Sequence, residues 1–137
     1  MRIFVDTSAF YALEDESDKN NKSARAFEKD LITGKLGLAQ ILTSNFVFDE
    51  LMTLVRRNLG HEKAVEVGER MRASKILTIE RIRHKNEIRA WEIFKSYSDK
   101  EFSYTDCTSF ALMESKAIRH TFAFDIHFEQ MGFRRLP

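Results

Sequence analysis

RIFVDTSAF, residues 2–10, predicts a buried strand that ends in a carboxylate and leads directly into a helix. The apolar residues of this stretch run without alternation, as expected for a strand covered on both faces of a parallel sheet. HTFAFD, residues 120–125, has the same form near the other end of the chain. Asp6 and Asp125 are therefore each expected at the C-terminal end of a strand.

Between these two strands, helical and strand patterns alternate. Helices are expected where apolar residues recur at helical spacing behind a capping residue, and strands where short apolar runs occur. The expected helices span 8–14, 20–31, 45–57, 62–71, 85–97 and 103–116, and the two further strands span 37–44 and 75–82. This alternation predicts an α/β fold with a mainly parallel sheet and right-handed crossovers.

The composition is that of one globular domain. The chain has 137 residues, of which 43% are hydrophobic and 31% charged, and this excludes a mainly disordered protein. The single cysteine, Cys107, excludes an intrachain disulfide and a thiolate zinc site, so a reducing, cytoplasmic setting is expected. Asp6 interrupts the only candidate signal sequence and no apolar run approaches about 18 residues, so neither export nor membrane insertion is expected.

The net charge of +1 is unevenly distributed. Basic residues exceed acidic ones only in the stretch 54–89, which includes Arg56 and Arg57. Two interpretations are open for this stretch. It forms a surface that attracts phosphate if half of its cations share a face, or it forms ordinary solvated helix faces in which glutamates alternate with the cations.

Four carboxylates can meet although they are far apart in sequence. Asp6 and Asp125 follow strands, Asp106 lies in the first turn of a helix, and Glu50 lies early in another. In an open parallel sheet these positions share one edge, where ligands usually bind. Two carboxylates about 4 Å apart repel by roughly 4 kcal/mol at an effective dielectric constant near 20, so such a cluster needs protons or a cation. Oxygen ligands that retain water favour Mg²⁺ or Mn²⁺ over zinc.

Each acid also has a purely structural interpretation. Asp106 follows Ser103 at the spacing of a capping box. Asp6 and Asp125 have the positions of turn or N-cap residues. Glu50 has an equally acidic neighbour, Asp49, on a helix whose charges are expected to be solvated.

Four motifs in order resemble those of PIN-domain ribonucleases, in particular the virulence-associated protein C (VapC) toxins. The motifs are FVDTSAF (4–10), DEL (49–51), SYTDCTSFALM (103–113) and FAFDIHFEQMGFRRL (122–136). The resemblance implies a single PIN-like nuclease domain over residues 1–137, built as a three-layer α/β/α sandwich around a four- to five-stranded sheet. It also implies that Asp6, Glu50, Asp106 and Asp125 are the catalytic and metal-binding residues, and it favours Glu50 over Asp49.

The function implied by the resemblance is a Mg²⁺- or Mn²⁺-dependent endoribonuclease that hydrolyses RNA phosphodiester bonds. Thr7 and Ser8 would orient a carboxylate or the attacking water, and Arg56 and Arg57 would bind the RNA backbone. The implied partners are a second copy of the chain and an antitoxin that inserts a basic residue among the acids. Two positions depart from the family pattern: Asn20 replaces a frequent histidine, and Ala123 replaces a frequent threonine.

Two other functions remain open. One is a PIN-like module that binds RNA or a protein without cutting it, and the other is a phosphoacceptor receiver domain. The receiver pattern has paired acids after the first strand, whereas Asp6 stands alone. The four histidines and Cys107 are expected in structural or surface roles, although His127 is close enough to Asp125 to approach the same edge. Trp91 and the twelve phenylalanines are expected chiefly in the core.

Overall fold

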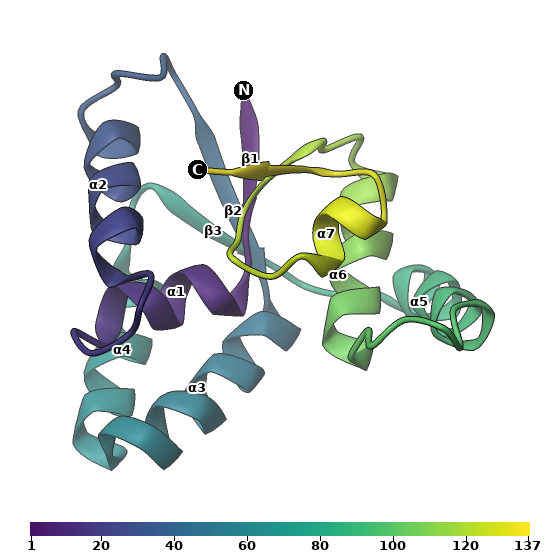
Figure 1. Ribbon diagram of the computed structural model, residues 1–137, viewed down its shortest axis with the longest axis horizontal. Coiled ribbons are helices and arrows are strands. Elements are labelled where there is room, and N and C mark those ends of the chain that lie inside the picture. Colours follow the sequence, from purple (N-terminus) through teal and green to yellow (C-terminus); the bar gives the residue numbers. More distant parts are fainter.

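A five-stranded parallel sheet forms the centre of the computed structural model, which describes residues 1–137 (Figure 1). The strands are β1 (Arg2–Val5), β2 (Gln40–Ser44), β3 (Leu77–Glu80), β4 (His120–Phe122) and β5 (Arg134–Leu136), in the spatial order β3-β2-β1-β4-β5. All four strand pairings are parallel, which confirms the predicted α/β class. β5 was not predicted, because it is a three-residue edge strand with two arginines that pairs only with β4.

Six of the seven helices agree with the predicted ones to within a few residues, and the four-residue α7 was not predicted. They are α1 (Thr7–Glu14), α2 (Asn21–Ile32), α3 (Asn45–Leu59), α4 (His61–Ala73), α5 (His84–Ser96), α6 (Tyr104–Ser115) and α7 (His127–Gln130). The strand expected from residue 37 begins only at Gln40, since Gly37 adopts a positive φ of 86° in the preceding loop. None of the seven helices is both long and apolar enough to cross a bilayer.

Helices cover both faces of the sheet, and β1 packs against both layers. Phe4 belongs to the core cluster formed with α5, α6 and α7, whereas Ile3 and Val5 belong to the cluster formed with α1 and α2. Successive side chains of a strand point to opposite faces, so a strand buried on both faces needs an unbroken apolar run. This explains the sequence of β1 and confirms the three-layer arrangement.

Helix α5 confirms the helix predicted over 85–97, but it buries a different face from the one expected. Ala90 and Ile93 point into the core, whereas Trp91 is 51% exposed. The helix over 85–97 was predicted from a stripe of apolar residues that recur every three positions, and the other members of this stripe are also exposed, namely Ile88, Phe94 and Tyr97. Residues spaced by three drift about 60° per step around a helix of 3.6 residues per turn, so this stripe winds away from the core. Trp91 is consequently a surface residue and not a core residue.

The topology creates a single ligand-binding edge. From β1 the chain moves outward through β2 to β3, then returns to β4 on the other side of β1. The strand order therefore reverses between β1 and β4, and open α/β sheets bind ligands outside the C-terminal ends of strands at such a point. Asp6 follows β1 directly and Asp125 follows β4 after two residues.

We expect Phe110→Ala to destabilise the fold strongly. Phe110 is fully buried, and its ring centroid lies 5.0 Å from that of Phe102 and 5.1 Å from that of Phe128. Truncation leaves a cavity among these rings, so the free energy of unfolding should fall by about 3–5 kcal/mol in urea denaturation. Leu38→Ala, at a side chain that is 95% exposed, is the control and should change it by less than about 0.5 kcal/mol. Equal effects of the two substitutions would contradict this description of the core.

Candidate metal centre

Asp6 stands at the junction of β1 and α1, where it caps the helix. Its Oδ2 accepts hydrogen bonds from the backbone N–H of Ser8 (3.1 Å) and from the Ser8 hydroxyl (2.7 Å). The same Ser8 Oγ accepts a hydrogen bond from the backbone N–H of Phe124 at 3.0 Å. Ser8 therefore connects the carboxylate after β1 to the loop after β4, next to Asp125.

Asp106 lies in the first turn of α6 and completes a capping box. Its backbone N–H donates to Ser103 Oγ and its Oδ2 accepts from the Ser103 N–H, both at 3.0 Å. The capping role predicted from the spacing is therefore real. It does not exclude a role in the site, because the same Oδ2 lies 3.0 Å from the ring of His127.

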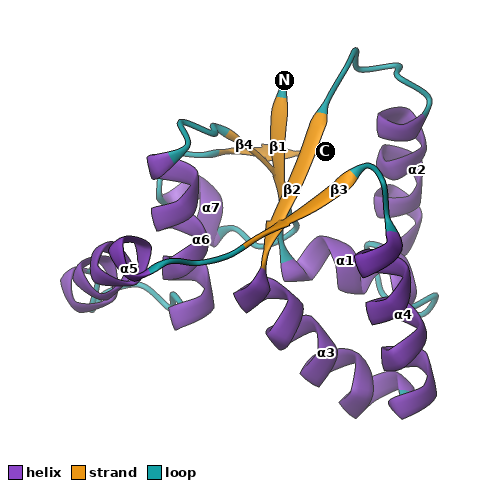
Figure 2. Cartoon of the chain, turned by 180° about the vertical axis from the view of Figure 1, so that it is seen from behind, coloured by secondary structure: helices purple, strands orange, loops and turns teal.

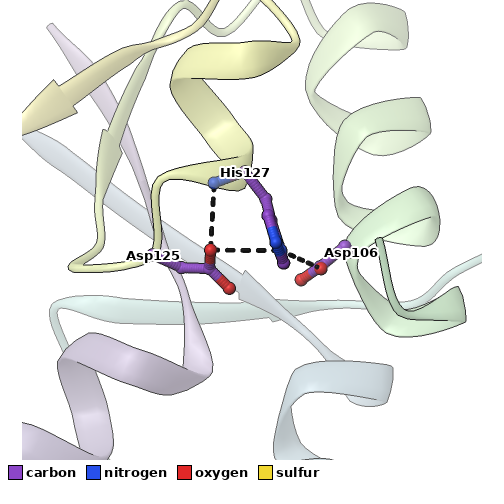
Figure 3. Close-up of side chains that lie close together, drawn as sticks. All are labelled: Asp106, Asp125 and His127. Carbon is purple, nitrogen blue, oxygen red and sulfur yellow. Dashed lines mark hydrogen bonds and ion pairs between the residues drawn. The ribbon is translucent and has the colours of Figure 1, made fainter. Parts of the chain in front are cut away.

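Asp125 and Asp106 lie on either side of the His127 imidazole (Figure 3). His127 Nδ1 is 3.0 Å from Asp106 Oδ2 and 3.1 Å from Asp125 Oδ1, and the His127 backbone N–H donates to Asp125 Oδ1 at 2.9 Å. An ionised carboxylate only accepts hydrogen bonds, so at least one proton must lie among these three side chains. Nδ1 is the ring atom that faces both acids, so an Nδ1–H group at this position would supply that proton.

Burial and the repulsion from neighbouring acids raise the pKa values of Asp6 and Asp106. Burial raises the pKa of Asp6 to about 7, and the negative charges of Asp106 and Asp125 add to the increase, against the hydrogen bonds from Ser8, which lower it. Burial also raises the pKa of Asp106, followed by the charge of Asp125, while the Ser103 N–H and His127 oppose the change. The charges of Asp106 and Asp125 thus act on Asp6, and the charge of Asp125 acts on Asp106. A positive charge placed among these three carboxylates would be stabilising.

The donor set fits a divalent cation. One ligand atom each from Asp106, Asp125 and His127 lie within 4.8 Å of one another. Carboxylate oxygens suit Mg²⁺ and Mn²⁺, and an added imidazole nitrogen is more compatible with Mn²⁺ than with Mg²⁺. An ion at this position would also replace the proton that now offsets the charge of the acids.

Glu50 lies on α3 and is not part of the group formed by Asp106, Asp125 and His127. It is half-buried and lines a hollow together with Asp49, Arg57 and Thr105, the residue before Asp106. No hydrogen bond or ion pair joins Glu50 to the aspartates. Asp49 and Glu50 both line this hollow, so the geometry does not distinguish which of them is the site residue. The preference for Glu50 rests on the family resemblance.

The remaining candidate residues are spread over the surface and core. Arg57 is exposed beside Glu50, whereas Arg56 lines a different hollow with His61 and Arg72. The Thr7 hydroxyl is buried without a hydrogen-bond partner and so makes no polar contact with any of the acids. Ser8 is the hydroxyl that contacts a carboxylate.

His127 is the residue of the site that the sequence-based candidates did not include. The histidines were expected in structural or surface roles, with His127 able to approach the edge that carries Asp125, and the structure places its ring against two acids. The available signal was its position two residues after Asp125. The contact with Asp106 depends on how α6 and α7 pack, and no local pattern reports that.

Comparisons with known proteins agree with this geometry. The PIN domain family matches residues 3–134. The chain is 37% identical over 131 residues to the 23S rRNA-specific endonuclease VapC20 of Mycobacterium tuberculosis, covering 96% of this chain and 95% of that protein.

Two crystal structures share the fold. That of M. tuberculosis VapC20, described as a Sarcin-Ricin loop cleaving toxin, matches with a TM-score of 0.86 at 34% identity over 96% of this chain and 95% of that one. FitAcB from Neisseria gonorrhoeae matches with a TM-score of 0.71 at 18% identity, over 100% of this chain and 97% of that one, and supports the fold alone. The chain therefore belongs to the PIN-domain ribonuclease family, in its VapC-type branch.

Proposed function

We propose that this protein is a divalent-metal-dependent endoribonuclease that hydrolyses RNA phosphodiester bonds, acting as the toxin of a toxin–antitoxin pair. The observation that carries the proposal is the group of buried aspartates at the edge of the sheet where the strand order reverses. Their raised pKa values express a need for positive charge that a metal ion satisfies. Residues 1–137 would act as one nuclease domain.

The proposed metal ligands are Asp6, Asp106 and Asp125, with Glu50 or a water held by it completing the set. Bound Mg²⁺ or Mn²⁺ would activate a water molecule and neutralise charge on the scissile phosphate. The protein's own contribution is to hold the carboxylates in place. Ser8 fixes the Asp6 carboxylate through two hydrogen bonds, and the Ser103 N–H fixes that of Asp106.

His127 has a separate task in this proposal. Its Nδ1–H group keeps Asp106 and Asp125 together while no cation is present, because it donates to both. The ring therefore preserves the spacing of two acids that would otherwise repel each other. We propose His127 as a positioning residue for the metal ligands.

RNA is the proposed substrate because a relative that is 37% identical over nearly its whole length is named as an endonuclease specific for 23S rRNA. Arg57 is exposed on the rim of the hollow that Glu50 lines, where it can hold a phosphate next to the acids. Arg56 points into another hollow of α3 and is the weaker candidate for substrate binding.

The proposed partners follow from the family. We expect an antitoxin whose basic residue enters the acidic site, where it would take the place of the cation, and a homodimer as the active form. The single cysteine, Cys107, is free and buried, which suits a reducing compartment, and we propose that the protein acts in the cytoplasm.

A module that binds RNA or a protein without cutting it is disfavoured. Such a module has no need to bring three repelling carboxylates together and to bury two of them, because burial costs free energy unless a cation binds. All four acids of the PIN pattern are present in this chain. Nothing in the structure supports the receiver-domain alternative.

We expect Asp6→Asn and Asp106→Asn to reduce RNA cleavage at saturating Mg²⁺ or Mn²⁺ by roughly 100-fold or more, because each removes a charged metal ligand. Cleavage is measured on total bacterial RNA by the appearance of fragments. EDTA should abolish activity of the unaltered protein, and excess Mg²⁺ or Mn²⁺ should restore it.

Asp30→Asn is the matched control for this assay, since Asp30 lies on α2 and pairs only with Lys35 at the surface. Its activity should stay within about twofold of that of the unaltered protein. If Asp6→Asn and Asp106→Asn cut RNA as fast as this control, the proposed function is wrong.

The metal-free protein should lose stability as the pH rises. The pKa of Asp6 is about 7 in the folded protein against an ordinary value of 3.8, so the folded state binds this proton more tightly than the unfolded chain. The resulting stabilisation is complete below about pH 4 and is lost as the pH rises through about 7. In EDTA, urea denaturation should show a free energy of unfolding lower at pH 8 than at pH 6 by on the order of 1–2 kcal/mol.

Two comparisons isolate the contribution of Asp6 to this effect. Asp6→Asn cannot ionise, so most of the difference between the two pH values should disappear in this variant. Added Mn²⁺ or Mg²⁺ should restore stability at pH 8 in the unaltered protein and not in the variant. A pH dependence that is the same in both proteins would show that Asp6 is not the group responsible.

A further inference from the structure

A partly exposed aromatic cluster lies on the helices that carry Glu50 and Asp106 and on α5, and has no role in the chemistry described above. We define the aromatic platform as Phe46, Trp91, Phe94 and Tyr104. Helix α5 packs beside α6 at the periphery of the molecule (Figure 2). Its side chains Trp91 and Phe94 are 51% and 42% exposed. We propose that this platform binds an unpaired base of the RNA substrate by stacking on Trp91, an inference that rests on the proposed function.

The platform has the geometry of a stacking surface. The rings of Trp91 and Phe94 are stacked, with centroids 5.7 Å apart and planes inclined by 19°. Tyr104 supports both from the side, with its centroid 6.4 Å from Trp91 and 6.0 Å from Phe94 in edge-on arrangements. Half of Trp91 nevertheless remains exposed. The indole is thus held by its neighbours while part of its surface stays available.

The platform is continuous with the elements that carry the acids. Tyr104 begins α6, two residues before Asp106, and Phe46 lies one turn before Glu50 on α3. The centroids of Phe46 and Tyr104 are 6.3 Å apart. Thr105, between Tyr104 and Asp106, lines the hollow that Glu50 faces. A strand whose phosphate lies at the acids therefore passes close to Tyr104 and can place a neighbouring base on Trp91.

The charges around Trp91 are of both signs. Lys95 and His84 line the same shallow hollow as Trp91, together with Glu87 and Glu92. Glu92 is paired with Arg89 at 3.4 Å. Lys95 forms no ion pair in the structure, whereas the nearby Arg89 is engaged by Glu114 at 2.9 Å. Lys95 is thus a free cation for a phosphate, next to a ring that accepts a base. Aromatic rings flanked by cations are the usual means by which proteins bind single-stranded RNA.

A second copy of this chain or another protein is the competing occupant of an exposed apolar face. We favour RNA for two reasons. The platform adjoins the residues proposed to act on RNA, and stacked rings beside an unpaired lysine match a base and its phosphate more specifically than they match an apolar protein surface. The experiment below separates the two.

Trp91 is the only tryptophan of the chain, so its fluorescence reports on the platform alone. The Asp6→Asn protein, which is expected not to cut, is titrated with single-stranded oligoadenylate of 12 nucleotides and with a blunt RNA duplex of the same length. We expect the single strand to quench the fluorescence and the duplex, which has no unpaired base, to leave it largely unchanged. Absence of quenching by the bound single strand overturns the proposal.

Substitutions then test whether the contact matters for affinity. Measured by anisotropy of fluorescein-labelled oligoadenylate, Trp91→Ala in the Asp6→Asn background should bind about 10-fold more weakly, and Trp91→Phe should recover much of the loss. Leu38→Ala, an exposed apolar residue distant from α5, should bind like its parent. Equal affinities of Trp91→Ala and Leu38→Ala overturn the proposal. Circular dichroism checks that each variant is folded.

Cleavage by proteins that retain Asp6 completes the test. Trp91→Ala should raise KM for RNA about 10-fold and change kcat by less than about twofold, since the ring binds the substrate away from the reacting atoms. If Trp91→Ala instead lowers the oligomeric state in light scattering and leaves KM for RNA unchanged, the platform is a protein interface and the proposal is wrong. Failure of the Asp6-containing protein to cut RNA, with quenching intact, would refute the proposed nuclease and not the stacking site.

Discussion

The repulsion among Asp6, Asp106 and Asp125 is the constraint on which this site depends. A fold that brings three carboxylates to one edge of a sheet and buries two of them must supply positive charge or protons there. In the structure Nδ1 of His127 lies within hydrogen-bond distance of two of the acids, while burial and the neighbouring acids still raise the pKa of Asp6 to about 7. A divalent cation meets this need for positive charge, and this connects the architecture to the chemistry.

The same carboxylates also stabilise the fold. Asp6 caps α1 and Asp106 completes the capping box of α6, so each side chain has one structural and one functional task. The two tasks are compatible because a cap uses one or two hydrogen bonds to a single oxygen and leaves the other oxygen available. It follows that an alanine at either position removes a cap as well as a ligand, whereas asparagine keeps an acceptor oxygen and removes only the charge.

The part of this structure that was predictable is the part that depends on local sequence. The unbroken apolar run of β1 reports its burial on both faces, and the spacing of Ser103 and Asp106 reports a cap. The contacts of His127, the outward orientation of Trp91 and the short edge strand β5 were missed, because each depends on how elements far apart in sequence pack together. Glu50 illustrates the remaining limit: the motif selects it over Asp49, and the geometry places both at one hollow.

An acidic site that acts on RNA repels the phosphate groups of its own substrate. A bound cation would replace this repulsion by attraction at the reacting phosphate. Its effect would not extend along the rest of the strand, because salt screens charges that are more than about a Debye length apart. Affinity for the rest of the strand must therefore come from outside the acidic cluster. Arg57 on the rim offers charge, and Trp91 offers stacking, which is independent of the sign of the local field. The division of tasks between buried acids and exposed aromatic rings is thus a consequence of using carboxylates to cut a polyanion.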